Sequence, residues 1–300
     1  MNTSENKIAS MVGVSDCITE SLSVDVEAVP TAGGGVWQNY KAGNTVAKVT
    51  GEAYLTPENE GQLREGSNVA IRVNETWLGG RVTTVTDRAD ARGRTLRQYG
   101  VVTNGSEFPT TGLQALYVPR WQRVPDRAVL RDWSGNGYDM RLVHADWSDT
   151  SLILTPQTRV YTDGIVFVNI GNDVTIIAKR TLTISPAVNS RGVMVSTLQG
   201  VIYVILEEFT ANGWQVRNLG RNTLVDVVPD GWSYYRRTDY NRQPLDVGAN
   251  SITNSRFSLS GTSGVTNYST LSALAIWSRR LSDAEIKAAE EILDAMQTHI

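Results

Sequence analysis

The sequence predicts a mainly β protein that ends in one amphipathic helix. Short segments in which apolar and polar residues alternate run through most of the 300 residues, and this period of two is typical of strands with one buried face. Turn-forming runs rich in Gly, Asn, Asp and Pro separate these segments. The apolar period changes to that of a helix only after Ser282. Hydrophobic residues make up 41% of the chain, which is enough for a sizeable core.

Residues 1–35 are expected to form an N-terminal attachment arm that ends in a glycine linker. The segment SLSVDVEAV places Leu22, Val24 and Val26 at alternate positions, so we expect a strand that buries them against a partner subunit. The glycines of VPTAGGG then supply a flexible joint. The first 60 residues have a net charge of −5, and the following stretch to Arg127 has +4, so the arm can dock on a neighbouring copy. Two solvated surfaces of opposite charge are the alternative.

Residues 36–125 are expected to form a small β-sandwich or barrel domain. The strand-like segments are NTVAKVTGEAYL, NVAIRVNETWL, GRVTTVTD and QYGVVTN, with turn signals between them. Within this part, Asp87–Arg97 (DRADARGRTLR) contains four arginines, whose planar forks suit carboxylates and phosphates. The functional interpretation of the segment is an anion or partner-protein contact, and an exposed hairpin tip is the favoured alternative.

Residues 126–300 form the third part, which begins near a tight turn with the sequence DWSGNGYD. Asp132 and Ser134 are placed to bond nearby backbone amides, and the pair Asn136-Gly137 suits left-handed backbone angles. The stretch resembles the D-x-S-G-N-G turn that opens laminin-G-like domains of the concanavalin-A-like jelly-roll class.

The far end of the chain carries a second match to the same family. The segment STLSALAIWSRRLSDAEI resembles the family's closing strand and helix. Independently of that resemblance, Ser282 is a good N-cap, and Glu285 three residues later completes a capping box. Leu281 before the cap is spaced to pack against Ile286. The sequence therefore predicts a helix that begins directly after Ser282.

The resemblance covers residues 128–300 and implies a jelly-roll sandwich with a C-terminal helix. Between the two end motifs, the strand-like segments match the family only in the alternation of strands and turns and carry no matching residues. The family's W-H-x-V-x-x-x-Y-D-G hairpin appears here as GWSYYRRTDYN, without the histidine or the Asp-Gly turn. This departure leaves the register of the central strands undetermined.

We expect no enzymatic activity from the third part. A retaining sugar hydrolase of this class would place two carboxylates on one face of a strand. The nearest candidates are Glu207 and Glu208, which are adjacent and therefore point to opposite faces. A strand end or a solvent-exposed edge explains them better. His144 and His299 are the two histidines, and a Ser-His-Asp triad stays open because triads assemble in space.

Carbohydrate binding requires aromatic faces on an exposed surface. The pool of aromatic residues contains Trp214, Trp232, Tyr234, Tyr235 and Tyr240. From it we choose Tyr235 and Tyr240, beside Arg236 and Arg237, as the expected exposed set. An ordinary surface without a ligand is the alternative.

A calcium site is the one metal centre that the sequence suggests. Asp239, Asn241 and Asp246 in TDYNRQPLD offer the oxygen ligands that calcium prefers. Such residues also stabilise turns by bonding to their own backbone. Apart from calcium we expect no cofactor, and the single cysteine, Cys17, excludes a disulfide framework.

The expected function follows from the layout together with the resemblance. The net charge of −3 gives no broad reason to bind nucleic acid, and no apolar run suggests insertion into a membrane. Laminin-G-like domains imply work outside cells on glycans or proteins, yet the N-terminus lacks the pattern of a secretion signal. We therefore expect a phage virion component (a fibre, decoration or tail-associated protein) that forms homo-oligomers through its arm. The alternative is an extracellular or cell-surface carbohydrate-binding module or glycan-active enzyme of the concanavalin-A-like class.

Overall fold

The computed structural model describes most of the chain. The described residues are 17–30, 40–56, 60–61, 63–73, 76–122, 128–148, 151–155, 157–162, 173–182, 194–197, 202–248, 255–259 and 269–297. The glycine run before Val36 and His299 lie outside them. The chain divides into two compact units, one of Met1–Pro109 with Lys287–Ile300 and one of Thr110–Ile286. Each unit is described separately below.

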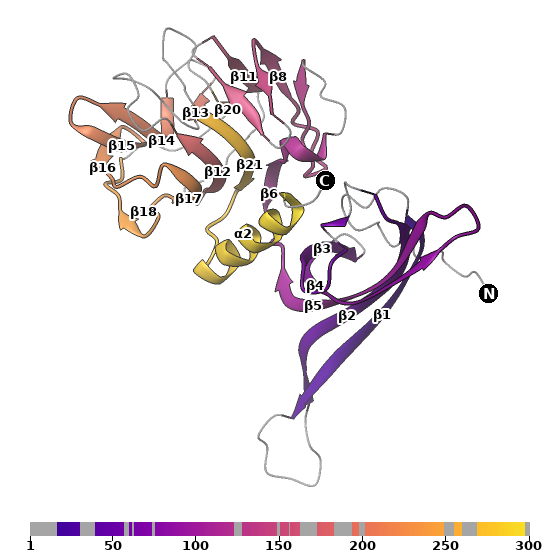
Figure 1. Ribbon diagram of the computed structural model, residues 1–300. Coiled ribbons are helices and arrows are strands. Elements are labelled where there is room, and N and C mark those ends of the chain that lie inside the picture. The colour runs from indigo at the N-terminus through magenta and orange to yellow at the C-terminus, as the bar shows by residue number, and fades with distance from the viewer. Residues whose placement is uncertain are drawn as a thin grey trace. The chain divides into compact units, whose positions relative to one another are not determined.

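The first unit contains one five-stranded antiparallel sheet in the order β1-β2-β5-β4-β3 (Figure 1). Its strands are β1 (Cys17–Pro30), β2 (Tyr40–Tyr54), β3 (Asn68–Val73), β4 (Thr76–Ala89) and β5 (Thr95–Glu107). Its core contains Val49, Ala53, Leu63, Val69, Val82, Tyr99 and Val101. The described residues therefore form one open sheet here, whereas the sequence predicted a sandwich or a closed barrel.

The expected arm is part of this sheet. β1 pairs with β2 in an antiparallel register that includes Leu22 opposite Val49. The expected boundary at residue 35 thus falls inside one sheet, and the boundary between the units lies after Pro109 instead of at residue 125. The local sequence could not reveal either boundary, because strand pairing joins segments that are distant along the chain. The side chains of β1 lie outside the description, so the burial of Leu22 and its alternate neighbours stays a prediction.

The arginine-rich segment is the tip of the β4–β5 hairpin, and three of its four arginines make ion pairs within the first unit. Arg97 pairs with Asp87, Arg88 with Glu52, and Arg94 with Asp90. Arg94 also lies over the ring of Tyr54, 3.8 Å from its centre. These contacts favour the interpretation as an exposed hairpin tip.

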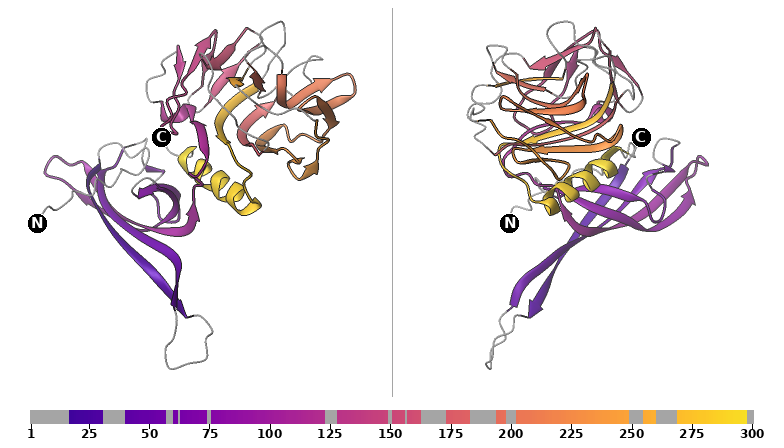
Figure 2. Two further views of the ribbon diagram at one scale, coloured as in Figure 1. Left: turned by 180° about the vertical axis from the view of Figure 1, so that it is seen from behind. Right: turned by 90° about the vertical axis from the view of Figure 1, so that its left-hand side faces the viewer.

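The second unit is a β-sandwich of two eight-stranded antiparallel sheets, as predicted (Figure 2). One sheet has the order β19-β18-β17-β12-β21-β10-β9, with β6 also paired to β21. Its strands are β6 (Leu113–Tyr117), β9 (Asp146–Trp147), β10 (Leu152–Leu154), β12 (Thr175–Leu182), β17 (Asp230–Arg236), β18 (Asp239–Tyr240), β19 (Gln243–Pro244) and β21 (Ser269–Trp277). One hydrophobic core contains side chains from both sheets.

The other sheet of the sandwich has the order β16-β15-β14-β13-β20-β11-β8-β7. Its strands are β7 (Val129–Leu130), β8 (Met140–Val143), β11 (Arg159–Thr162), β13 (Met194–Thr197), β14 (Ile202–Thr210), β15 (Gly213–Asn218), β16 (Arg221–Leu224) and β20 (Ser255–Ser258). A 3-10 turn, η1 (Pro119–Trp121), follows β6.

The turn DWSGNGYD, which follows β7, is hydrogen-bonded to strand β6. The Asp132 carboxylate accepts hydrogen bonds from the amides of Leu116 and Ser134, at 3.0 and 2.9 Å. The Asn136 amide donates to the carbonyl oxygen of Gln114 at 2.9 Å. The positive φ angles belong to Gly135 and Gly137. Asp132 and Ser134 thus act as predicted, whereas Asn136 contributes its side chain and has no left-handed backbone angle.

The C-terminal helix α2 (Asp283–Gln297) begins at the predicted capping box. The Ser282 amide donates to the Glu285 carboxylate at 2.8 Å, and the Glu285 amide donates to the Ser282 hydroxyl at 3.2 Å. Leu281 and Ile286 are both buried, as expected for the apolar contact across the cap. Within the described part of the chain, no helix combines the length and apolarity needed to cross a bilayer.

Candidate functional site

The aromatic residues chosen from the sequence are in the core. Tyr235 and Tyr240 both have 0% of their surface exposed. The Tyr235 hydroxyl donates to the side-chain oxygen of Asn218 at 2.7 Å, and burial raises the pKa of both tyrosines. The expectation of an exposed stacking surface was therefore wrong. Alternation along β17 showed that Trp232 and Tyr235 point to opposite faces, but it could not show which face lay between the sheets.

Of the two neighbouring arginines, Arg236 is bound within the protein. Arg236 is buried, and its guanidinium pairs with Asp239 at 2.6 Å and with Asp283 at 2.7 Å. It also donates to the carbonyl oxygen of Leu281 at 3.2 Å, so it joins the β17–β18 hairpin to the start of the helix. Arg237 is half-buried, and its carbonyl oxygen accepts a hydrogen bond from Asn218 at 2.7 Å. Arg236 thus has a structural role, and a role for the Arg237 side chain in sugar binding stays a prediction.

Two of the three proposed calcium ligands, Asp239 and Asn241, use their side-chain oxygens within the protein. Burial of Asp239 opposes its charge, but hydrogen bonds from Arg236 and Thr238 lower the pKa of this carboxyl group. Asn241 sits in the tight β18–β19 turn with φ 45, and its side-chain oxygen accepts from the Tyr234 amide at 2.8 Å. Asp246 contributes its backbone, whose amide donates to the Thr223 hydroxyl at 3.0 Å. The side chains of Asp239 and Asn241 therefore have partners within the protein, whereas Asp246 contributes backbone groups.

No cluster of potential metal ligands appears in the described residues. Within them, no group of three or more His, Cys, Asp or Glu side chains is arranged to hold a metal ion. Asp239 instead contacts two arginines, Arg236 at 2.6 Å and Arg280 at 3.7 Å. Cations so close to the carboxylate oppose the approach of a second cation.

Glu207 and Glu208 point in opposite directions, as predicted, but both are buried. Glu207 accepts from the Arg180 guanidinium at 2.9 Å and from the Tyr240 hydroxyl at 2.8 Å. Glu208 pairs with Arg217 of the neighbouring strand at 3.0 Å. The expectation that the pair marks a strand end or a solvent-exposed edge was therefore wrong. Sequence alone did not reveal the two arginine partners, which lie on other strands.

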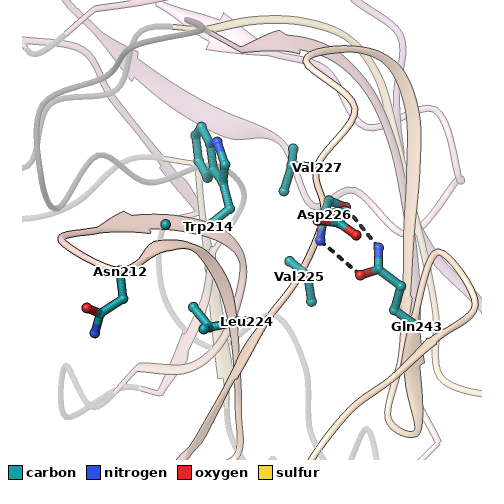
Figure 3. Close-up of a pocket in the computed structure, with 8 residues that line it drawn as sticks. Asn212, Trp214, Leu224, Val225, Asp226, Val227 and Gln243 are labelled. Carbon is teal, nitrogen blue, oxygen red and sulfur yellow. Dashed lines mark hydrogen bonds between the residues drawn. The ribbon is translucent and has the colours of Figure 1, made fainter.

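The second unit contains a cleft of about 500 Å³ (Figure 3). It brings together the β14–β15 turn, strand β15, the end of β16, the segment that follows it, and β19. β15 and β16 belong to one sheet, and β19 belongs to the other. The lining residues are Asn212, Gly213, Trp214, Leu224, Val225, Asp226, Val227 and Gln243.

The β14–β15 turn positions Trp214 in this cleft. Gly213 has φ 111, a backbone angle that residues with a side chain resist. The Thr210 hydroxyl donates to the Gly213 carbonyl oxygen at 2.9 Å and closes the turn. Trp214 then pairs across the strands with Phe209, with their ring centres 5.3 Å apart in an edge-to-face arrangement. One side of Trp214 packs against the sandwich core, so the indole is held in place.

Polar groups form the opposite wall of the cleft. The Gln243 side chain donates to the carbonyl oxygen of Asp226 at 2.8 Å and accepts from the Asp226 amide at 2.9 Å. Figure 3 shows both bonds. The Gln243 side chain thus binds the amide and the carbonyl oxygen of one residue, as the backbone of a paired strand does, and holds the segment after β16 in place. Asp226 and Asn212 are exposed, and the Leu224 side chain is 61% exposed. The cleft therefore offers an indole, an exposed aliphatic side chain and several hydrogen-bonding groups.

Sequence reasoning included Trp214 among the aromatic candidates but did not choose it. The signal that could have found it is the Asn212-Gly213 turn directly before the tryptophan, because such turns close hairpins at the exposed end of a sheet. The rest of the cleft comes from β16 and β19, whose approach to Trp214 depends on how the two sheets pack.

Comparisons with known proteins assign no family. No protein-family model matches the chain, and no curated protein matches it. A solved structure of Trypanosoma rangeli sialidase in complex with sialic acid matches 94% of this chain and 54% of that chain, with 12% identity and a TM-score of 0.48. The same sialidase with the inhibitor DANA matches 91% of this chain at 12% identity, with the same TM-score. The chain thus spans about half the length of the sialidases it matches.

Particle proteins also match, over a smaller part of the chain. A protein of the virion of a native gene transfer agent particle matches 31% of this chain and 84% of that chain, with 11% identity and a TM-score of 0.25. A protein of the tail of an empty gene transfer agent particle matches 31% of this chain, with 12% identity and a TM-score of 0.24. Similarities at this level, like those to the sialidases, assign neither a fold nor a function.

Proposed function

We propose that the chain is a non-enzymatic structural and binding protein whose laminin-G-like sandwich binds glycans in the cleft beside Trp214. The observation that carries this proposal is the position of Trp214: partly buried, fixed by Phe209, and set among the polar groups of the cleft. A sugar ring has apolar C–H faces and a rim of hydroxyl groups. The indole suits the faces, and Asn212 and Asp226 suit the rim.

The expected affinity of one cleft is low. The cleft has the volume of a small-molecule site, but its walls are partly exposed, so each sugar loses little of its water. Several copies on one assembly would bind far more tightly, since the second contact becomes intramolecular once the first is made. Weak binding by one unit thus fits a protein that acts in many copies.

Two features support binding without hydrolysis. Two-carboxylate hydrolysis needs a pair of acids about 5–10 Å apart on either side of the sugar bond. Among the described residues that line the cleft, Asp226 is the only acid. Glu207 and Glu208 are buried against arginines, where a sugar does not reach them.

The location that we propose is a phage virion, in which the protein would be a fibre, decoration or tail-associated component. The supporting features are the laminin-G-like end motifs and a separate first unit with a long edge strand. Quantitative mass spectrometry of purified particles tests this location. A fixed copy number per particle is the expected result, and absence from particles produced in cells that contain the protein would contradict it.

A glycan array with the full chain, followed by calorimetry on the best ligand, tests the cleft. Trp214→Ala should lower the affinity by about tenfold, because stacking on an aromatic ring contributes roughly 1 kcal/mol beyond its buried area. Trp133→Ala is the matched control, since this tryptophan is 41% exposed and does not line the cleft. Leu224→Ala provides a second cleft variant at an exposed position that carries little risk to folding.

Three outcomes would contradict the proposal. Equal losses for Trp214→Ala and Trp133→Ala would place the binding elsewhere, and so would unchanged binding by both cleft variants. Release of reducing ends from a polysaccharide, abolished by Asp226→Asn, would show that the chain is a glycan-active enzyme.

A further inference from the structure

The β1–β2 hairpin extends beyond the other three strands of its sheet. Val24–Pro30 of β1 pairs with Tyr40–Ala47 of β2, with one irregularity after Val26. β2 begins its pairing with β5 only at Lys48. Figure 1 shows this two-stranded part of the first unit, here called the ribbon, projecting beyond β3, β4 and β5.

A two-stranded ribbon is at best marginally stable in water, because it lacks the third strand or packed layer that independent stability requires. In the described residues, β1 pairs with β2 alone, and the Tyr40–Ala47 part of β2 pairs with β1 alone. The ribbon therefore has one open edge on each of its two strands. Open edges of this length promote pairing with another chain.

We propose that the ribbon joins copies of this chain head to tail, with the β1 edge of one copy pairing with the β2 edge of the next. The partner at each edge is thus a second copy, and the two ribbons form one continuous sheet. The inference rests on the proposed assembly role and specifies the surface that carries it. It is independent of the glycan cleft.

Strand direction and length both suit this pairing. Where the strands run along a ring axis, rotation about that axis keeps the β1 strands of all copies in the same direction, and β2 runs opposite to β1. A β2 edge added to the β1 edge of a neighbour therefore makes an antiparallel pair, which continues the pattern of the sheet. The two edges also have similar lengths, from Val24 to Pro30 and from Tyr40 to Ala47.

Charge distinguishes this arrangement from a symmetric one. Within the ribbon, β1 carries Asp25 and Glu27 and no basic residue, whereas β2 carries Lys41 and no acidic residue. Pairing β1 with β2 brings opposite charges together. Pairing two β1 edges about a twofold axis would bring four acidic residues together, and like charges across strands are destabilising.

Head-to-tail pairing has a consequence for the assembly. An interface between two different surfaces of the same chain continues from copy to copy until the rotation closes it into a ring, or it runs on as a filament. A twofold pairing of identical edges would stop at a dimer.

Single-cysteine variants of the full chain test the pairing. In a Cys17→Ser background, one chain carries Ala28→Cys on β1 and another carries Ala42→Cys on β2. Mild oxidation to a disulfide should join the two variants of the mixture into covalent dimers. It should leave each variant alone without a cross-link, because equivalent strands of neighbouring copies lie two strand spacings, about 10 Å, apart, which is too far for a disulfide. Ala91→Cys at the tip of the β4–β5 hairpin is the control, because it should not cross-link to Ala42→Cys.

Cross-linking of the Ala28→Cys chain with itself would indicate a symmetric β1–β1 contact and overturn the proposal, and so would an absence of cross-links in the mixture. Charge variants supply a second measurement by sedimentation. Asp25→Lys with Glu27→Lys should weaken association by about tenfold, and so should Lys41→Glu, while all three changes in one chain should restore it. Failure of this restoration, with folding verified by circular dichroism, would also contradict the pairing.

The two proposals fail separately. If the ribbons cross-link but purified particles lack the protein, the virion location is wrong and the pairing stands. If particles contain the protein but the ribbons do not cross-link, the pairing alone is wrong.

Discussion

Arg180 of β12 and Glu207 of β14 form an ion pair in the interior of the sandwich, with 2.9 Å between Nη2 and Oε1. Their side chains are 3% and 0% exposed. Burial opposes the charge of Arg180, but the carboxylate of Glu207 and the hydroxyl of Tyr240 raise the pKa of its guanidinium. Because β12 and β14 belong to different sheets, the pair fixes the two layers to each other.

Removing one partner of this pair should be strongly destabilising. Glu207→Leu leaves the Arg180 charge buried without its carboxylate, and such changes cost about 3–5 kcal/mol. Urea unfolding followed by tryptophan fluorescence measures the loss. The matched control is the double variant Arg180→Met with Glu207→Leu, which should recover most of the stability because no buried charge remains. A loss below about 1 kcal/mol for Glu207→Leu would contradict the buried pair.

The helix cap gives a second prediction. Ser282→Ala removes the hydroxyl that accepts from the Glu285 amide, and we expect a loss of about 1 kcal/mol in the free energy of unfolding. Ser282→Asp retains an acceptor at the same position and should stay within a few tenths of a kcal/mol of the parent. Equal losses for the two variants would mean that the cap does not contribute to stability.

The stability of the cap should also depend on pH. A hydrogen bond from Arg279 lowers the pKa of Glu285 to about 2 from the usual 4.5, with help from the amide and hydroxyl of Ser282. A carboxyl group whose pKa is lowered by folding stabilises the folded state above the unfolded pKa, and this contribution is lost as the pH falls through the folded pKa. The contribution is therefore expected in full above about pH 4.5 and should disappear towards pH 2.

Urea unfolding of the parent and of Glu285→Gln at several pH values tests this dependence. The stability difference between them should shrink as the pH falls from 5 towards about 2. Arg279→Met removes the largest cause of the low pKa, so its loss of stability should also depend on pH. A difference that stays constant over this range would contradict the assignment.

A fourth prediction concerns close packing at a glycine. Gly248 is buried, and a Cβ atom there would overlap the backbone carbonyl of Leu219. Backbone cannot move aside as a flexible side chain can, so Gly248→Ala should destabilise the chain by about 1–3 kcal/mol or more. Gly61→Ala is the control, because a Cβ atom there meets nothing within 4 Å. Thermal unfolding of both variants measures the difference, and similar midpoints would contradict the close approach.

Several features of the fold could be predicted because their causes are local. The capping box joins Ser282 to a residue three positions away, and the carboxylate of Asp132 bonds amides within the same turn. Alternation of apolar and polar residues depends on the backbone of one strand alone, so it also identified strand segments. It showed that Glu207 and Glu208 point to opposite faces.

The candidate site was less predictable, because it depends on which face of each strand is covered. Sequence parity separates Tyr235 from Trp232 but does not say which of the two meets the opposite sheet. Tyr235 lies in the core, and the exposed aromatic cleft forms instead at Trp214, with walls from β16 and β19. The closest approach of these segments is set by the packing of the two sheets.

By itself, the sequence determined the mainly β class, the turn at Asp132, and the residue at which the helix begins. Only the tertiary structure decided that β1 is an edge strand of the first sheet, that Glu207 forms an ion pair with Arg180, and that Trp214 lies in a cleft. The physical reason is the range of the interactions. Periodicity and capping act within a few residues, whereas strand pairing and burial join segments that are distant along the chain.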